Sequence, residues 1–496
     1  MDTVERLPAA GPRDRHEIEP VPRTVPLLSG APIEPPDRED DVSATWSYRD
    51  ALRELWERSN YDRGYIANPF GDRASGERGL ARVRELLRLA GNPDDKMLVA
   101  HVAGSKGKGS TAAMIAAIAG AAGYRVGLYT SPHLHSFRER IAVDAVPIAE
   151  PGFARLAQRV AVLASELENA NPELGDISAF ELLTVMALAH FQATNRDLVV
   201  LEVGLGGTYD ATNVVSPAVS VVTKLDLEHT AVLGSTLEAI ATAKAGIFKL
   251  GVPVVSSPQP ASVVTVLESL ALERDSAFLV GGRDWRWTGH WRRFSVEGPW
   301  GTYRSLASAL PGDHQMENAA TAIAAAWTLN AGGFTLTEGN MRQGLRRVQL
   351  SGRFEPVPLA NGVVAILDGA HTPASARALA ETVRAEYPGR SVILVLGTSA
   401  DKDVASLGRE LAWIAHRVIA THSRSPRAVP ATLVAAGLSA FPVAIEVQSS
   451  VADAVSRAKA LAQPGDLIVI TGSLFVVAEA REALGLGMPD PDPGGP

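Results

Sequence analysis

The chain has 496 residues, of which 46% are hydrophobic and 21% charged, a balance typical of a globular protein with two large domains or about three ordinary ones. Its formal net charge of −8 argues against nucleic acid as the main partner, so anionic ligands would need local positive sites. The lack of cysteine excludes disulfide bonds and thiolate metal sites, and suits a cytoplasmic protein.

The two ends of the chain differ from the rest in composition. Residues 1–44 are rich in proline and charge, which predicts a flexible leader, and the first residues lack the apolar core of a signal peptide. Residues 487–496 are rich in glycine, proline and aspartate, which predicts a disordered tail. No uninterrupted apolar stretch reaches the ~20 residues that cross a bilayer, so we expect no membrane partner.

Between these ends, apolar β-branched runs alternate with stretches of helical periodicity. Predicted strands of the first series are Leu98–Ala103, Val126–Tyr129, Leu198–Val203, Val219–Thr223 and Val252–Val255. Predicted helices between them include Thr111–Ala122, Phe153–Leu167, Ala179–Phe191 and Leu237–Phe248. Strands that are apolar throughout and alternate with helices indicate a parallel sheet covered on both faces.

A second α/β series follows a different kind of segment. Residues 285–303 alternate aromatic and polar side chains with glycines, which predicts a hairpin or small antiparallel element. The strands predicted after it are Val363–Leu367, Val392–Leu396, Arg417–Ala420, Ala444–Val447 and Leu467–Thr471. We therefore predict two α/β domains, at residues 45–353 and 354–486.

The first predicted strand leads into a glycine-rich loop with the sequence Gly-Ser-Lys-Gly-Lys-Gly-Ser-Thr at 104–111. Glycines let backbone N–H groups approach phosphates, Lys108 adds a charge, and the helix N-terminus adds a positive dipole end. The strict P-loop pattern would place a glycine at Val102 and a hydroxyl at Gly109. The loop alone therefore indicates either a variant nucleotide site or a glycine-rich turn.

Polar residues follow three further strands at the edge where ligands of parallel sheets bind. Ser131 follows the second strand, Glu202 lies in the third, and His229 follows the fourth. A hydroxyl, a carboxylate and an imidazole could bind Mg²⁺ beside phosphates, with Ser131 supplying the hydroxyl that Gly109 lacks. Each residue also has an ordinary interpretation, as a turn serine, a paired carboxylate or a structural histidine, so spacing leaves the assignment open.

Further motifs occur in order within residues 46–482. They read Tyr-Thr-Ser-Pro-His-Leu at 129–134, Leu-Glu-Val-Gly-Leu-Gly-Gly at 201–207, Glu-His-Thr at 228–230, Gly-Arg-Phe-Glu at 352–355 and Asp-Gly-Ala-His-Thr-Pro at 368–373. Together with the glycine loop, this ordered set resembles the folylpolyglutamate synthase/dihydrofolate synthase family, a branch of the Mur ligase superfamily.

The resemblance implies a two-domain Mur-ligase-like α/β fold, with a P-loop parallel-sheet ATPase domain followed by a smaller Rossmann-like domain. It implies an ATP- and Mg²⁺-dependent ligase that adds L-glutamate to a folate carboxylate through an acyl phosphate. The acceptor would be a reduced folate, dihydropteroate, or both. We expect a cytoplasmic monomer that uses small-molecule substrates.

The resemblance also implies roles for individual residues. Lys108, Glu202, His229 and Lys244 match catalytic residues, and Lys244 matches a lysine that is carbamylated in the family. Ser131, Glu202 and His229 match the magnesium ligands, while Phe137 and Arg140 lie where the family binds folate. The matching ATP-binding residues are Gly104, Ser105, Lys106, Gly107, Lys108, Gly109, Ser110, Thr111, Asn318, Arg353, Asp368 and His371. Closure of the two domains would hinge near 353–356.

Four residues depart from the family pattern. Lys106, Thr208, Glu228 and Thr372 stand where Asn, Arg, Asp and Asn are usual, and none of them is one of the metal ligands. Three alternatives stay open beside the folate ligase. They are a related ligase that acts on a non-folate carboxylate, a P-loop phosphotransferase or NTPase with no amine requirement, and a binding protein without catalysis.

Overall fold

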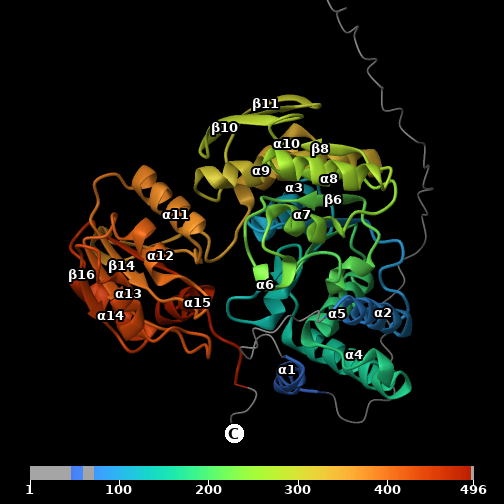
Figure 1. Ribbon diagram of the computed structural model, residues 1–496, viewed down its shortest axis with the longest axis horizontal. Helices are drawn as coiled ribbons and strands as arrows, with labels where there is room; N and C mark the ends of the chain where they lie inside the picture. Colours follow the sequence, from blue (N-terminus) through green and yellow to red (C-terminus); the bar gives the residue numbers. More distant parts are fainter. Residues whose placement is uncertain (1–45, 60–71, 493–496) are drawn as a thin grey trace, which may run out of the picture. The chain divides into compact units, whose positions relative to one another are not determined.

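The computed structural model describes residues 46–59 and 72–492, which belong to one compact unit (Figure 1). The leader predicted at 1–44 lies outside the described residues. The described strands form sheets of eight, three and six strands. In this part of the chain, the helices are too short or too polar for any of them to span a bilayer.

The eight-stranded sheet carries the first α/β series in the order β4-β3-β2-β5-β1-β6-β7-β8. Its strands are β1 (Val99–Ala103), β2 (Val126–Tyr129), β3 (Ile141–Val143), β4 (Val146–Pro147), β5 (Leu198–Glu202), β6 (Val219–Val222), β7 (Val254–Ser256) and β8 (Phe278–Val280). In this spatial order, all pairings from β2 through β5, β1, β6 and β7 to β8 are parallel, as predicted. At one edge of the sheet, β3 pairs antiparallel with β2 and β4 antiparallel with β3. The β2–β3 connection contains a 3₁₀ turn in place of the crossover helix that a parallel pairing needs.

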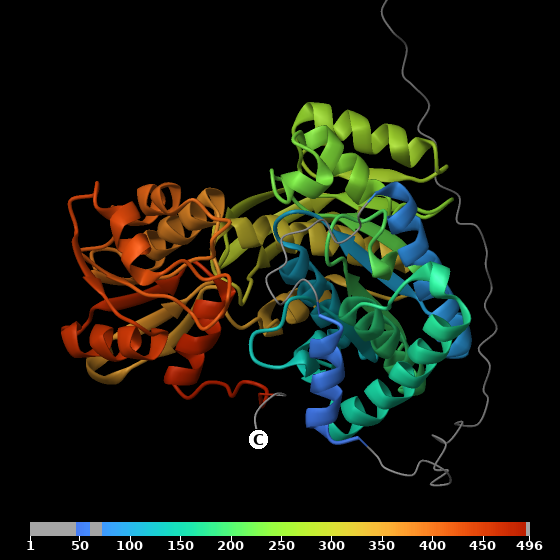
Figure 2. The same ribbon diagram turned by 60° about the horizontal axis from the view of Figure 1, so that its bottom comes forward.

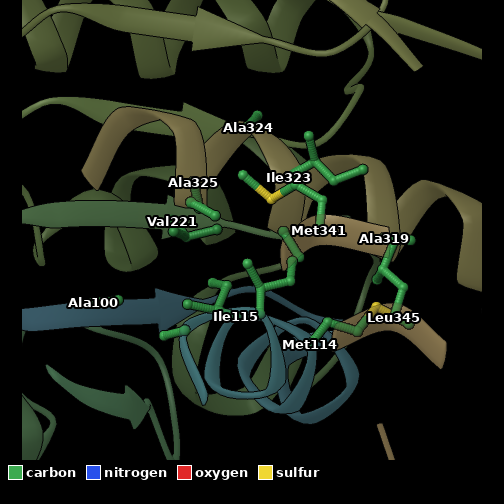
Figure 3. Close-up of a cluster of buried hydrophobic side chains, with 14 of the residues drawn as sticks. Ala100, Met114, Ile115, Val221, Ala319, Ile323, Ala324, Ala325, Met341 and Leu345 are labelled. Atoms are coloured by element: carbon green, nitrogen blue, oxygen red, sulfur yellow. The ribbon is translucent and has the colours of Figure 1, made fainter. Parts of the chain in front are cut away.

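Helices cover both faces of this sheet. They are α1 (Tyr48–Glu57), α2 (Arg73–Leu89), α3 (Lys108–Ala121), α4 (Glu150–Ala170), α5 (Ala179–Ala193), α6 (Thr230–Leu233), α7 (Leu237–Ala245), α8 (Ala261–Leu272), α9 (Asp313–Leu329) and α10 (Glu338–Arg347). Alternate residues of β1 point to opposite cores: Ala100 and Val102 pack with α3, α9 and α10, whereas Val99 packs with α1, α2, α4 and α5. Figure 3 shows the first of these cores, between β1 and the helices.

The close crossing of α3 and α10 depends on Gly344. A Cβ at this position would lie 2.5 Å from the Cα of Ile118. Because backbone atoms cannot move aside as a side chain can, we expect Gly344→Ala to lower the free energy of unfolding by about 1–3 kcal/mol. Gly339→Ala in the same helix is the control, since its nearest neighbour would be Thr337 Oγ1 at 3.5 Å. Urea unfolding of both variants checks this, and equal stabilities would contradict the packing argument.

The segment predicted as a small antiparallel element forms the three-stranded sheet. Its strands are β9 (Arg286–His290), β10 (Arg293–Gly298) and β11 (Gly301–Leu306), in the order β11-β10-β9 with antiparallel pairings. Trp285, Phe294 and Val296 are buried in the core that contains α3 and α9. The aromatic residues of this segment therefore serve packing.

The six-stranded sheet carries the second α/β series in the order β12-β13-β17-β14-β15-β16. Its strands are β12 (Glu355–Pro358), β13 (Val364–Leu367), β14 (Val392–Leu396), β15 (Arg417–Ala420), β16 (Ala444–Val447) and β17 (Leu467–Thr471). All pairings except β12–β13 are parallel. The five predicted strands are confirmed, and the boundary predicted at 353/354 falls between α10 and β12.

Helices also lie on both faces of this second sheet (Figure 2). They are α11 (Pro373–Glu386), α12 (Val404–Leu411), α13 (Ala431–Leu438), α14 (Val451–Leu461) and α15 (Leu474–Ala483). One apolar core includes residues of α11, α12 and α13, and the other includes residues of α14 and α15. Thr372, one of the four departures, is the N-cap of α11 and accepts a hydrogen bond from Ser375 N, a role that threonine fills well.

The end of the described chain is anchored. The amide of Asp490 donates to the carbonyl of His135 at 2.9 Å, and its carboxylate accepts from Tyr48 Oη and Phe137 N at 2.7 and 2.8 Å. The described residues 487–492 therefore differ from the disordered tail predicted at 487–496, because composition does not reveal a single carboxylate with partners far away in sequence.

Candidate active site

The strand order brings the predicted site residues to one edge of the eight-stranded sheet. β5 lies between β2 and β1, and β6 lies on the other side of β1. The glycine loop, Ser131, Glu202 and His229 therefore all follow or end neighbouring parallel strands. This is the edge at which open α/β sheets bind their ligands.

Two positions of the glycine loop require glycine. Gly104 and Gly107 have φ angles of 147° and 85°. A Cβ at Gly104 would lie 1.9 Å from Thr223 Oγ1, and a Cβ at Gly107 would lie 2.1 Å from Asn318 Oδ1. The structure thus places Asn318, which lies on α9, directly against the glycine loop.

The loop leaves the first turn of α3 uncapped by any side chain. Ser105 N and Lys106 N both donate to the carbonyl of Lys224, at 3.0 and 2.9 Å. The N-cap of α3 is Gly107, which has no side chain, so the first N–H groups of the helix are left for an anion. Ser110 and Thr111 are buried in this turn, and Thr111 Oγ1 has no hydrogen-bond partner among the described residues.

Two lysines meet at one carbonyl of the loop. Lys108 Nζ and Lys244 Nζ donate to Gly104 O at 3.0 and 2.8 Å, and Lys244 also donates to Glu228 Oε1 at 3.1 Å. Lys244 is 1% exposed. Burial, together with the charge of Lys108, lowers its pKa to about 8, while Glu228 acts in the opposite direction.

Glu228 explains two of the departures together. Its other carboxylate oxygen lies 3.7 Å from Lys106 Nζ, so one carboxylate partners both Lys106 and Lys244. The cation added at Lys106 therefore has an anion near it. Although burial opposes ionisation, the charges of Lys108, Lys244 and Lys106 hold the pKa of Glu228 below its usual range.

Glu202 lies beside the N-terminus of α3. Its Oε2 accepts a hydrogen bond from Ser131 N at 3.0 Å, and both oxygens would lie 3.5 Å from a Cβ at Gly109. The missing side chain of Gly109 thus leaves space next to the carboxylate. Burial raises the pKa of Glu202, and the charges of Lys108 and Arg353 partly offset this.

His229 is exposed and begins α6 with a left-handed φ of 47°, an uncommon backbone conformation for a residue other than glycine. Across the described residues, no three His, Asp or Glu side chains form a cluster that could hold a metal ion. The predicted set of Ser131, Glu202 and His229 contains only two such side chains and a hydroxyl, so its role as a metal site stays a prediction.

The predicted nucleotide contacts of the second domain lie close to each other. The carboxylate of Asp368 accepts from Phe354 N and Ala370 N at 2.7 and 2.9 Å, and burial raises its pKa against the charge of Arg353. His371 Nδ1 lies 2.7 Å from Gly369 O. Burial lowers the pKa of His371 to about 4.

The charge of Lys106, in the glycine loop, acts on His371 of the second domain. Burial is the main cause of the lowered pKa of His371. The hydrogen bond to Gly369 opposes it, and the charges of Lys106 and Lys402 lower the pKa further. Lys402 belongs to the Asp-Lys-Asp segment at 401–403 of the family resemblance, but its spacing connects it with no role at the glycine loop. His314, part of the His-Gln pair at 314–315 in the family resemblance, was likewise given no role, although its imidazole acts on the pKa of Asp368.

Phe137 and Arg140, the residues predicted to contact folate, lie in a buried cluster. Phe137 is 2% and Arg140 5% exposed. Arg140 Nε donates to His133 Nδ1 at 2.9 Å, its guanidinium lies 5.1 Å from the centre of the Phe137 ring, and the His133 and Phe137 rings are 4.4 Å apart. Both residues therefore organise the β2–β3 connection from within, while His133 is the more accessible of the three.

Thr208, where the family has arginine, packs against α7. Its N–H and hydroxyl both donate to Ala243 O, at 2.9 and 3.0 Å. A Cβ at Gly246 would lie 2.2 Å from Thr208 Oγ1, so the two segments approach too closely for a larger residue at Gly246. This contact explains how threonine is accommodated, and it offers no charge to an anion.

Comparisons with known proteins agree on one group of enzymes. Residues 352–474 match the family model for the Mur ligase glutamate ligase domain. The dihydrofolate synthase/folylpolyglutamate synthase of Bacillus subtilis is 31% identical, over 82% of this chain and 95% of its own length. The corresponding protein of Mycobacterium tuberculosis is 34% identical, over 82% of this chain and 90% of its own.

Solved structures agree with these relatives over most of the chain. The folylpolyglutamate synthase of Mycobacterium tuberculosis complexed with ADP superposes with a TM-score of 0.80 at 30% identity, covering 90% of this chain and 99% of the other. Escherichia coli FolC in complex with DHPP and ADP gives a TM-score of 0.76 at 29% identity, covering 90% and 99%.

Proposed function

Because the chain belongs to the folylpolyglutamate synthase/dihydrofolate synthase family of ATP-dependent ligases, we propose that it adds L-glutamate to a folate carboxylate, to dihydropteroate, or to both. The observation that carries this proposal is the edge of the eight-stranded sheet, where an uncapped helix N-terminus, Lys108 and Glu202 lie together. We also propose that ATP binds at this edge, as its relatives are described with ADP.

The site residues fit the charges of the reaction. The first-turn N–H groups of α3 and Lys108 hold the phosphates, and Asn318 fixes the loop from α9. The acceptor carboxylate forms a bond to the γ-phosphorus while the bond to the bridging oxygen of ADP breaks. The glutamate amine then bonds to the acyl carbon, phosphate leaves, and the amine loses its proton. Positioning and charge neutralisation lower both barriers, because an anion must approach an anion.

Mg²⁺ would be held by Ser131, Glu202 and His229. The space left by Gly109 beside the Glu202 carboxylate fits an ion that uses one or two carboxylates with phosphate oxygens and water. When bound, the ion would supply positive charge to the phosphates. Histidine is an unusual ligand for Mg²⁺, so the hydroxyl and the carboxylate carry most of this assignment.

Lys244 is suited to carbamylation. Only a neutral amine reacts with carbon dioxide, and a pKa of about 8 leaves about a tenth of the side chains neutral at pH 7. The carbamate would replace a buried cation by an anion next to Lys108. Two anions, Glu228 and the carbamate, would then face the two cations Lys106 and Lys108.

The second domain would complete the nucleotide site. The charge of Arg353 acts on the pKa of both Asp368 and His371, and the charge of Lys106 in the glycine loop acts on the pKa of His371. We expect Arg353, Asp368 and His371 to close over the nucleotide when the chain bends near 353–356. Lys106 would then approach the nucleotide from the first domain and His371 from the second. We expect the active form to be a cytoplasmic monomer.

Product mass tests the proposed activity. Purified full chain with ATP, Mg²⁺ and glutamate should convert tetrahydrofolate or dihydropteroate into a product one glutamate heavier, with ADP formed in equal amount. Omitting glutamate should abolish the mass change, whereas a phosphotransferase would still transfer phosphate. A heavier product only from a non-folate carboxylate in a parallel panel would overturn the folate assignment and favour the related ligase.

A further inference from the structure

Residues between Arg481 and Asp490 contact the β2–β3 connection, the segment that contains Ser131, Phe137 and Arg140. Arg481 on α15 donates from Nε to His135 Nε2 at 3.1 Å and from Nη2 to Leu486 O at 2.9 Å. It also pairs with Glu355 at the start of β12. The amide of Asp490 then donates to His135 O. Both ends of the stretch 481–490 therefore contact this segment at His135.

Asp490 completes the hydrogen bonding of the 3₁₀ turn η1 (Phe137–Arg140). Short helices begin with N–H groups that need acceptors from outside the helix. Here six successive amides have one each: Glu139 accepts from Leu134, His135 and Ser136, Asp490 accepts from Phe137, Ser136 Oγ accepts from Arg138, and Ser136 O accepts from Glu139. The acceptor of Phe137 N is the only one of these that comes from outside the segment.

The second oxygen of Asp490 reaches a third element. Tyr48 Oη on α1 donates to it at 2.7 Å and lies 3.0 Å from Ser136 Oγ. The Arg138 guanidinium lies 5.7 Å from the centre of the Tyr48 ring, and its positive charge also acts on the Asp490 carboxylate. One side chain near the end of the chain thus joins α1, η1 and the backbone of His135.

We infer that Asp490 is a positioning residue for the acceptor substrate. By accepting from the amide of Phe137, it fixes the β2–β3 connection, near the start of which Ser131 N donates to Glu202. The inference rests on the proposed function, because it takes this connection to be where the folate or pteroate binds. Since Arg481 and Asp490 both follow the second sheet in sequence, the acceptor site is tied to the second domain by these bonds.

Asp490→Ala in the full-length chain tests the inference in two independent measurements. Hydrogen exchange of the peptide that spans 134–141 should become roughly tenfold faster, as expected when a charged hydrogen bond of about 1.4 kcal/mol is lost. The KM for the folate acceptor should rise roughly tenfold, while the KM for ATP and the unfolding temperature change little. Asp490→Asn, which keeps one acceptor oxygen, should lie between the wild type and Asp490→Ala.

Two further variants separate positioning from loosening of the fold. Tyr48→Phe should raise the folate KM in the same direction and by less than additively with Asp490→Ala, because both remove the same bond. Asp50→Asn is the control, since Asp50 caps the same helix α1 through Ser47. It should leave the folate KM unchanged.

The outcomes distinguish the inference from the proposed function. Unchanged exchange at 134–141 in Asp490→Ala would overturn the anchoring itself. Faster exchange with an unchanged folate KM, or with a parallel rise of the ATP KM, would overturn the positioning role. If the wild-type chain glutamylates no folate or pteroate, the proposed function fails and the acceptor role fails with it, while exchange still decides whether Asp490 holds the segment.

Discussion

Replacement of Glu202 by glutamine is expected to lower turnover about a thousandfold while the unfolding temperature stays near that of the wild type. The loss is of the size seen when one charge-stabilising group is removed from an active site. Glutamine has almost the volume of glutamate, and its amide oxygen can still accept the hydrogen bond from Ser131 N. It removes the negative charge beside Lys108 and the N-terminus of α3, where the reaction needs it.

Glu181 provides the matched control for this variant. It is also a buried carboxylate of the first domain, 7% exposed compared with 5% for Glu202, but it caps α5 and pairs with Arg82. Glu181→Gln should therefore lower the free energy of unfolding by about 1–3 kcal/mol and leave kcat nearly unchanged. Steady-state kinetics and urea unfolding of both variants check this. Full turnover in Glu202→Gln would show that the charge at Glu202 is not required.

Most strands of the two α/β series could be predicted because their apolar runs are buried on both faces. Val392–Leu396 and Leu467–Thr471, for example, are buried at every position. Each is therefore a continuous apolar run whose first and last residues mark the ends of the strand. The direction of β3 could not be predicted from its residues. It depends on the short connection after β2, which is too compact to cross over the sheet.

The neighbourhood of Ser131 and Glu202 was predictable for a topological reason. Carboxyl ends of adjacent parallel strands share an edge, and β2 pairs with β5. The bond of Lys244 to Gly104 O, the role of Glu228 for two lysines and the anchoring by Asp490 were not predictable. Each joins segments far apart in sequence through a single side chain, and such contacts leave no periodic pattern. The roles of these residues in catalysis stay predictions.

Lys244 and Lys108 donate to the same carbonyl, but we expect different small molecules to restore the turnover of their alanine variants. Each substitution should lower turnover by at least about a hundredfold, because each removes a charged group from the pattern around the phosphates. If Lys244 acts as a carbamate, the group that is lost is an anion. Acetate or propionate should then partly restore Lys244→Ala by entering the space of the side chain.

Lys108→Ala should show the opposite response, because its role requires a cation beside the phosphates. Carboxylates should leave it inactive, and a small amine such as ethylammonium should restore part of its turnover. Turnover of both variants across a concentration series of each additive, at constant ionic strength, makes the comparison. Restoration of Lys244→Ala by ethylammonium and not by carboxylates would show that Lys244 acts as a cation, in keeping with its bond to Glu228, and would exclude the carbamate.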